Sequence, residues 1–226
     1  MITFDPIYWL LIAPALILGI WAQFRIKWTY ANAQRMGAPL SGAAAARHIL
    51  DQAGLANVGI EMVPGHLSDH YDPRAKVLRL SDEVYQSRTL AAVGIAAHEA
   101  GHAIQDARAY APLVVRNAAV PVAGFGSNAG ILMAIVGFAV SQAWLIWAGI
   151  ILFSGVVFFQ LVNLPVEFNA SARAKAVLVD LGIVSRDELY YVKKVLNAAA
   201  LTYVAATLQA ILTLIYLILR FSGNRD

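Results

Sequence analysis

The sequence predicts a mainly α-helical membrane protein, with four transmembrane helices and a small cytoplasmic core of mixed α and β structure. Three observations lead to this fold class. Of the 226 residues, 59% are hydrophobic and 14% are charged, whereas a soluble domain has about 25% charged residues. Four apolar runs each have the length of a bilayer-spanning helix. The polar stretches between them contain the turn and strand patterns of a compact domain.

The four apolar runs are the predicted transmembrane helices, and they cover residues 4–24, 113–140, 144–162 and 198–219. The first run has no basic leader and no small-residue cleavage pattern, so we expect a retained helix rather than a signal peptide. The alternative is a soluble protein in which these helices form the core. Four such runs leave too little polar sequence to cover them, so the membrane interpretation is favoured.

Lysine and arginine residues predict the orientation of the chain in the membrane. Ten lie between Arg25 and Arg116, five between Arg173 and Lys194, and two follow the last apolar run. By the positive-inside rule, residues 25–112 and 163–197 are cytoplasmic, and we expect a multi-pass protein of the plasma (inner) membrane. The basic residues do not form the cluster that a nucleic-acid footprint requires, so no nucleic-acid partner is expected.

The first cytoplasmic segment is predicted to form a small α+β unit. Ser41 can cap a helix that ends near Gly54. Residues 58–63 and 76–80 have the length and apolar content of strands, and a polar loop separates them. A long helix is then expected over residues 88–110, and it continues through Pro112 into the second transmembrane run.

The second cytoplasmic segment is predicted to be helical. Asn163 or Leu164 at the boundary and Pro165 in the first turn suit the start of a helix that ends at Gly182. Ser185 and Glu188 then have the spacing of a capping box, which would begin the helix that leads into the last transmembrane run.

His98, Glu99 and His102 form an HExxH motif inside the predicted helix 88–110. Two histidines four residues apart lie on one face of a helix, where both rings can reach a single zinc ion. The glutamate between them is placed to accept a proton from a water molecule at that metal. The motif therefore predicts a zinc-hydrolase site in a minimal zincin-like core, with one zinc ion per chain.

A catalytic zinc site needs three protein ligands and an open position, and the absence of cysteine leaves His, Glu and Asp to supply the third. Glu167 is the favoured candidate, because a lone carboxylate beside a hydrophobic run is costly without a partner. The alternative is an ordinary acidic residue in the first turn of a helix. His48 is expected at the surface, and His66 and His70 lie in a loop without fixed geometry.

Three segments resemble the YugP-type neutral zinc metallopeptidases, a family of small bacterial membrane proteins. They are HEAGHAIQDA, the preceding GHLSDHYDPRAKVLRLS and the later LPVEFNASARA. The resemblance covers nearly the whole chain and implies a membrane-embedded gluzincin. It implies that His98, His102 and Glu167 bind the metal and that Glu99 is the catalytic glutamate.

A more distant resemblance is to the HtpX-like membrane proteases, whose third-ligand motif is Glu-x-x-Ala-Asp. In this chain Ser171 stands at the position of the aspartate that would orient a zinc-binding histidine. Ser171 or Asn169 is expected to replace it through a weaker hydrogen bond. Candidates for stabilising charge in the transition state are His66, His70, Tyr71, Tyr110 and Arg173.

The expected function is hydrolysis of peptide bonds near the cytoplasmic membrane face by a zinc-dependent endopeptidase. Its partners would be a peptide or membrane-protein substrate and the lipid bilayer, and the oligomeric state is left open. The strand at residues 76–80 could pair with an extended substrate.

Two other classes of function are weighed against this one. An inactive zinc-binding scaffold or adaptor would need the ligands but not Glu99, which is present. A small transporter would need ionisable residues in the middle of the membrane runs, and the sequence has none there.

Overall fold

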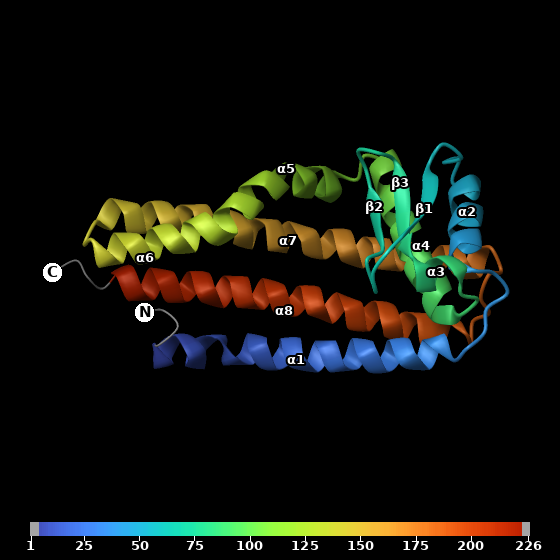
Figure 1. Cartoon of the computed structure of the whole chain (residues 1–226), viewed down its shortest axis with the longest axis horizontal. Helices are drawn as coiled ribbons and strands as arrows, with labels where there is room; N and C mark the ends of the chain where they lie inside the picture. Colours follow the sequence, from blue (N-terminus) through green and yellow to red (C-terminus); the bar gives the residue numbers. More distant parts are fainter. Residues whose placement is uncertain (1–4, 223–226) are drawn as a thin grey trace. The chain divides into compact units, whose positions relative to one another are not determined.

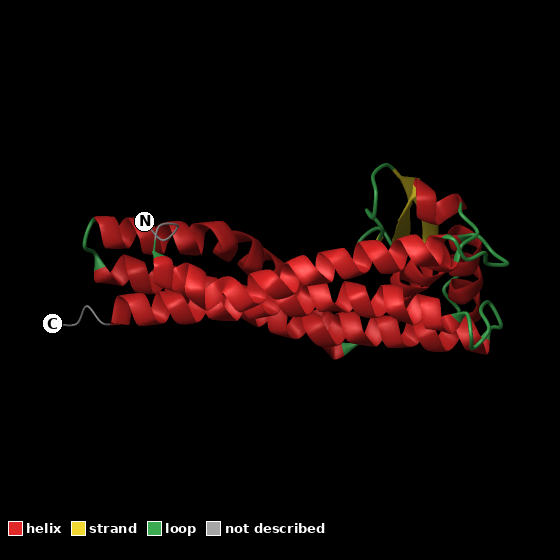
Figure 2. Ribbon diagram, turned by 90° about the horizontal axis from the view of Figure 1, so that it is seen from below, coloured by secondary structure: helices red, strands yellow, loops and turns green. Residues whose placement is uncertain are grey.

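The computed structural model describes residues 5–222, and it is built mainly from helices (Figures 1 and 2). Four of its helical segments are long and apolar enough to cross a membrane: Pro6–Gln34, Ala111–Ala139, Ala143–Asp180 and Leu189–Phe221. The prediction of a mainly helical protein with four such helices is therefore confirmed.

The described chain divides into two compact units. One contains the residues up to Ala22, Val114–Leu164 and the residues from Leu201 onward, and the other contains Gln23–Leu113 and Pro165–Ala200. The helices α1 (Pro6–Gln34), α7 (Ala143–Asp180) and α8 (Leu189–Ser222) contribute residues to both units.

Within residues 5–222, the first unit consists of helical segments and the short links between them. The second apolar segment consists of α5 (Ala111–Phe125), the π-helical turn η2 (Gly126–Gly130) and α6 (Ile131–Ala139). It lies against α7 through paired glycines, because a Cβ built on Gly130 would lie 2.9 Å from the carbonyl oxygen of Gly149. Small residues of this kind let helix backbones approach closely in a membrane.

The second unit contains a three-stranded sheet and the HEAGH helix. Its strands are β1 (Gly59–Val63), β2 (His70–Asp72) and β3 (Val77–Ser81). The helices that lie wholly in this unit are α2 (Gly42–Gln52), α3 (Asp82–Gln86) and the HEAGH helix α4 (Leu90–Ala107). The strand order is β1-β3-β2, with β1 parallel and β2 antiparallel to β3. The helix predicted to begin at Ser41 and the two strands predicted around residues 58–63 and 76–80 are confirmed.

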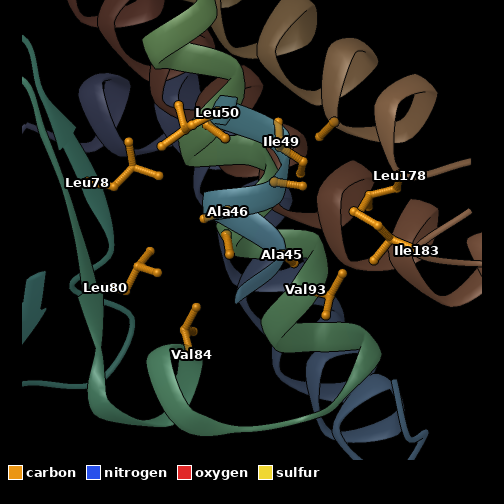
Figure 3. Packing of buried hydrophobic residues seen from close by; sticks show 14 of the residues in the cluster. Ala45, Ala46, Ile49, Leu50, Leu78, Leu80, Val84, Val93, Leu178 and Ile183 are labelled. Atoms are coloured by element: carbon orange, nitrogen blue, oxygen red, sulfur yellow. The ribbon is translucent and has the colours of Figure 1, made fainter. Parts of the chain in front are cut away.

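One hydrophobic core joins the sheet to the helices of the second unit (Figure 3). Leu78 and Leu80 point from β3 toward α2, where Ala46 and Leu50 face them. All four side chains are fully buried. Burying a leucine side chain contributes roughly 1.5–3 kcal/mol, so this contact holds the sheet against the helix pair α2 and α4.

The strand β2 lies in the stretch that the sequence predicts to be a polar loop. It forms a hairpin with β3, and Asp72 stabilises the turn by accepting hydrogen bonds from the amides of Arg74 and Ala75.

β3 is the central strand of the sheet, with β1 on one side and β2 on the other. Residues 77–79 are paired on both sides, so the expectation that this strand pairs with a substrate is wrong. The free edges of the sheet belong to β1 and β2.

The helix α4 ends before the second apolar segment begins. Ala109 adopts a left-handed conformation with a φ of 48°, and α5 starts at Ala111. The expectation of one helix that runs from α4 directly through Pro112 is therefore wrong. Pro112 has no N–H to donate to the carbonyl of Arg108, and proline is instead well tolerated in the first turn of a new helix.

The helix α7 is continuous over 38 residues, and Pro165 lies inside it. The prediction that a helix starts at residues 163–165 is therefore wrong. Pro165 cannot donate to the carbonyl of Leu161, a loss that long membrane helices tolerate when neighbouring groups compensate. Glu167 consequently lies in the interior of a helix, which excludes its interpretation as a first-turn charge.

The capping box before the last helix is confirmed. The amide of Ser185 donates to Glu188 Oε2 at 2.7 Å, and the amide of Glu188 donates to Ser185 Oγ at 3.2 Å. These two reciprocal bonds satisfy amides that a helix start otherwise leaves without partners. α8 follows directly, from Leu189.

Candidate metal centre and active site

The HEAGH motif occupies the buried middle of α4. Thr89 caps this helix by accepting a hydrogen bond from the amide of Ala92 at 3.3 Å. Side chains four residues apart share one face of a helix, so His98 and His102 lie one above the other. Their ring centroids are 4.7 Å apart and the rings are nearly perpendicular.

Glu167 reaches the two histidines from α7. Its Oε2 atom lies 3.3 Å from Nε2 of His98 and 3.6 Å from Nε2 of His102. One possible ligand atom from each of the three residues falls within 4.8 Å of the others. The structure thus brings together, from two helices, the three side chains that the sequence singled out as metal ligands.

The close approach of α4 and α7 depends on a glycine. A Cβ built on Gly101 would lie 2.8 Å from the carbonyl oxygen of Ala170. Gly101 lies between the ligands His98 and His102 on α4, and Ala170 lies three residues after the ligand Glu167 on α7. No larger residue fits at position 101 without moving the backbone of α7 away from the histidines.

We expect Gly101→Ala to lower the free energy of unfolding by about 1–3 kcal/mol, because the added methyl group overpacks a backbone contact. The zinc affinity should fall as well, since the helices that carry the ligands must separate. Thermal unfolding and zinc titration of the purified protein measure the two effects. Gly37→Ala is the matched control, because a Cβ there has no neighbour within 4 Å. Equal behaviour of the two variants would contradict this account of the helix contact.

The second ring nitrogen of each histidine has its own partner. Ser171 Oγ lies 3.1 Å from Nδ1 of His98, which is the hydrogen bond expected of the residue that replaces aspartate. Gln105 Oε1 lies 3.0 Å from Nδ1 of His102. Sequence reasoning missed Gln105. Its position, three residues after His102 on the same helix face, is the signal that could have found it.

Glu99 is buried beside the metal ligands, with 8% of its surface exposed. Its Oε2 atom accepts a hydrogen bond from the backbone amide of Tyr71 at 3.1 Å. Tyr71 lies in the edge strand β2, so the strand that the sequence did not predict is the one that contacts the catalytic candidate. This bond holds the carboxylate in one orientation.

The Tyr71 side chain is also tied to α4. Its hydroxyl donates to Asp106 Oδ2 at 2.9 Å. Burial raises the pKa of the Tyr71 hydroxyl, and the hydrogen bond to Asp106 raises it further. The hydroxyl proton is already donated, so Tyr71 is not a free donor for charge in a transition state.

The loop before β2 is anchored by Asp69. This half-buried carboxylate accepts hydrogen bonds from the amide and the hydroxyl of Ser81, at 2.8 and 3.1 Å. Burial raises the pKa of Asp69, although the bonds from Ser81 oppose the rise. The anchor connects the segment before Tyr71 to the end of β3.

The remaining candidates have other partners. Nδ1 of His66 lies 3.2 Å from Oε2 of Glu83 on α3, and Nδ1 of His70 lies 2.8 Å from the carbonyl oxygen of Ser68. Both histidines and His48 are exposed. Arg173 donates from Nε to Asn169 Oδ1 at 2.7 Å. Tyr110 lies in the link between α4 and α5.

The charges around His102 favour a cation. Burial alone would lower the pKa of its ring, because burial disfavours the charged form. The neighbouring carboxylates of Glu167 and Glu99 outweigh burial, so the pKa of the His102 ring lies above its usual value. The site therefore has the electrostatic character needed to hold a positive ion.

The donor set also fits zinc in particular. Two imidazole nitrogens and a carboxylate oxygen are the ligands of the His₂Glu type of catalytic zinc site, which leaves a fourth position for water or substrate. In this chain both Nδ1 atoms are engaged elsewhere and both Nε2 atoms face Glu167. His98, His102 and Glu167 would hold the ion.

Comparison with known proteins agrees with this geometry. Residues 8–222 match the family described as "Putative neutral zinc metallopeptidase". The chain belongs to this family. It is also 46% identical over 214 residues to "Putative membrane protease YugP" of Bacillus subtilis (strain 168), an alignment that covers 94% of this chain and 95% of the relative. No solved structure matches the chain. The family resemblance inferred from the three sequence motifs is thereby confirmed.

Proposed function

We propose that this protein is a zinc-dependent endopeptidase of the plasma (inner) membrane, which cleaves peptide bonds near the cytoplasmic membrane face. The observation that carries the proposal is the convergence of His98, His102 and Glu167, with Glu99 buried beside them. Membership of a zinc metallopeptidase family and the name of the Bacillus relative, a membrane protease, support it.

The chemistry is divided between the ion and Glu99. Bound zinc supplies a Lewis acid that lowers the pKa of water and polarises a carbonyl group. The Glu99 carboxylate accepts a proton from the attacking water and delivers it to the nitrogen of the leaving amine. The amide of Tyr71 orients this carboxylate, so the proton acceptor has a defined position before a substrate arrives.

The edge strand β2 is the part of the sheet suited to bind an extended peptide. It is paired with β3 on one side only, and the Tyr71 amide at this strand contacts Glu99. Main-chain pairing with an edge strand tolerates many substrate sequences. The substrate would be a peptide or a membrane protein with an extended segment close to the bilayer.

The second candidate function is an inactive zinc-binding scaffold or adaptor. It needs the three ligands but has no use for a buried carboxylate that is held by a backbone amide. The position of Glu99 therefore favours catalysis.

Purified protein in detergent tests the proposal directly. A chelator should abolish hydrolysis of a mixed peptide library, and one equivalent of zinc per chain should restore it. Zinc binding without any hydrolysis by the wild-type protein would argue for the scaffold. Hydrolysis that persists without metal would refute the zinc-dependent mechanism.

The proposed topology places both halves of the site in the cytoplasm. Reporter fusions at Ser68 and at Arg186 should both report a cytoplasmic location, because fifteen of the seventeen Lys and Arg residues lie in or beside these two segments. A fusion at Gln142, in the link between α6 and α7, should report the opposite side. Opposite locations for Ser68 and Arg186 would be incompatible with a site built from both segments.

A further inference from the structure

The side-chain amides of Gln105 and Asn169 connect the metal site on α4 to α7. Nε2 of Gln105 donates to the carbonyl oxygen of Val166 at 2.9 Å and to Asn169 Oδ1 at 3.0 Å. Asn169 Oδ1 also accepts the bond from Arg173. The Gln105 side chain has no exposed surface, so water does not compete for these bonds.

The partners determine which way each amide points. The Nε atom of Arg173 can only donate, so the Asn169 atom that faces it must be the oxygen. The carbonyl oxygen of Val166 can only accept, so the Gln105 atom that faces it must be the nitrogen. The oxygen of Gln105 is left facing Nδ1 of His102.

The Gln105 oxygen can only accept a hydrogen bond, so it determines which nitrogen of the His102 ring carries the proton. Nδ1 of neutral His102 must carry the hydrogen, and Nε2 then presents a lone pair. Nε2 lies 3.6 Å from Glu167 Oε2. Two electron-rich atoms at this distance attract each other only through a shared cation.

We propose that Gln105 is a positioning residue for the metal centre: its amide holds His102 as the Nδ1–H tautomer and directs Nε2 toward Glu167. The same amide connects α4 to the backbone of α7 one residue before Glu167. Gln105 therefore sets both the tautomer of one ligand and its separation from another. This inference rests on the zinc site proposed above.

The two histidines differ in this respect. The Ser171 hydroxyl beside His98 can donate or accept a hydrogen bond, so it leaves the position of that ring proton open. Only His102 has a partner whose own contacts exclude one tautomer. Loss of the Ser171 hydroxyl should accordingly weaken zinc binding less than loss of the Gln105 acceptor.

The first test is zinc affinity, measured by competition with a chelator. Gln105→Met keeps an unbranched side chain of similar length but has no acceptor, and we expect zinc binding about 10- to 100-fold weaker, as for other residues that orient a metal ligand. Gln105→Glu keeps an oxygen opposite Nδ1 but loses the donor to Val166 and Asn169, so its zinc affinity should lie between those of Gln105→Met and the wild type. Asn169→Ala leaves the bond to Val166 intact, so its loss should be much smaller.

Zinc binding by Gln105→Met as tight as that of the wild type would overturn the proposal. An equal loss in Asn169→Ala would also overturn it, because this variant keeps both the oxygen opposite Nδ1 and the bond to Val166. Thermal unfolding of the metal-free variants shows whether each one folds.

A second measurement needs no variant at position 105. Nitrogen-15 NMR of histidine-labelled wild-type protein without metal distinguishes a protonated from an unprotonated ring nitrogen. The expected result for neutral His102 is a proton on Nδ1, assigned by its loss in His102→Ala, and a proton on Nε2 would refute the inference. Neither measurement involves hydrolysis, so both would test the role of Gln105 even if the protein binds zinc but cleaves no peptide.

Discussion

Glu99→Gln should retain zinc and lose hydrolysis by about two to four powers of ten, the usual effect of removing a general base. The amide has the shape of the carboxylate but cannot accept the proton of the attacking water. Glu99 does not contribute an atom to the His98, His102 and Glu167 cluster, so the metal content should stay the same. The measurements are turnover of a peptide substrate and zinc per chain in the same preparation.

The control for this variant is Glu61→Gln. Glu61 is an exposed carboxylate on β1 that contacts Arg79 at 3.3 Å, and exposed ion pairs of this kind contribute about 0–1 kcal/mol. Its activity should equal that of the wild type. Unchanged turnover in Glu99→Gln would remove Glu99 from the mechanism. Loss of zinc in Glu99→Gln would show that Glu99 helps to hold the ion.

The second large effect is expected when two ligands from different helices are removed together. A His98→Ala, Glu167→Ala variant should contain no tightly bound zinc and should have no activity, because one histidine cannot hold the ion alone. Wild-type protein should contain one zinc ion per chain. Metal analysis of both proteins, purified in the same detergent and dialysed against the same buffer, makes the comparison.

His48→Ala is the matched control for the loss of a histidine. This side chain is exposed on α2 and belongs to no cluster of metal ligands among residues 5–222. Its zinc content should equal that of the wild type. Full zinc occupancy in the double variant would mean that the ion binds elsewhere, and the proposed centre would then be wrong.

Several features of this protein follow from patterns that are local in the chain. The four apolar helices were predictable because length and hydropathy are properties of continuous segments. The capping box at Ser185 and Glu188 was predictable because its two partners are three residues apart. The placement of His98 and His102 on one face depends only on the period of a helix.

The errors arose where short polar patterns have more than one solution. The strand β2 has three residues, too few to show alternation, and it forms because Leu78 and its neighbours in β3 offer it a partner. Pro165 suits a helix start, but it also fits inside a long membrane helix. Only the packing around α7 decides between the two.

The sequence by itself determined the chemistry available to this protein: two histidines in helical register, a glutamate between them, no cysteine, and four segments suited to a membrane. Only the tertiary structure decided how that chemistry is arranged. It set Glu167 within reach of both rings, placed the amide of Tyr71 on Glu99 and turned the amide of Gln105 toward His102. The physical reason is distance along the chain. Spacing within one helix determines which side chains share a face. Contacts between α4, α7 and β2 depend instead on close packing at Gly101 and on hydrogen bonds whose partners lie up to 73 residues apart.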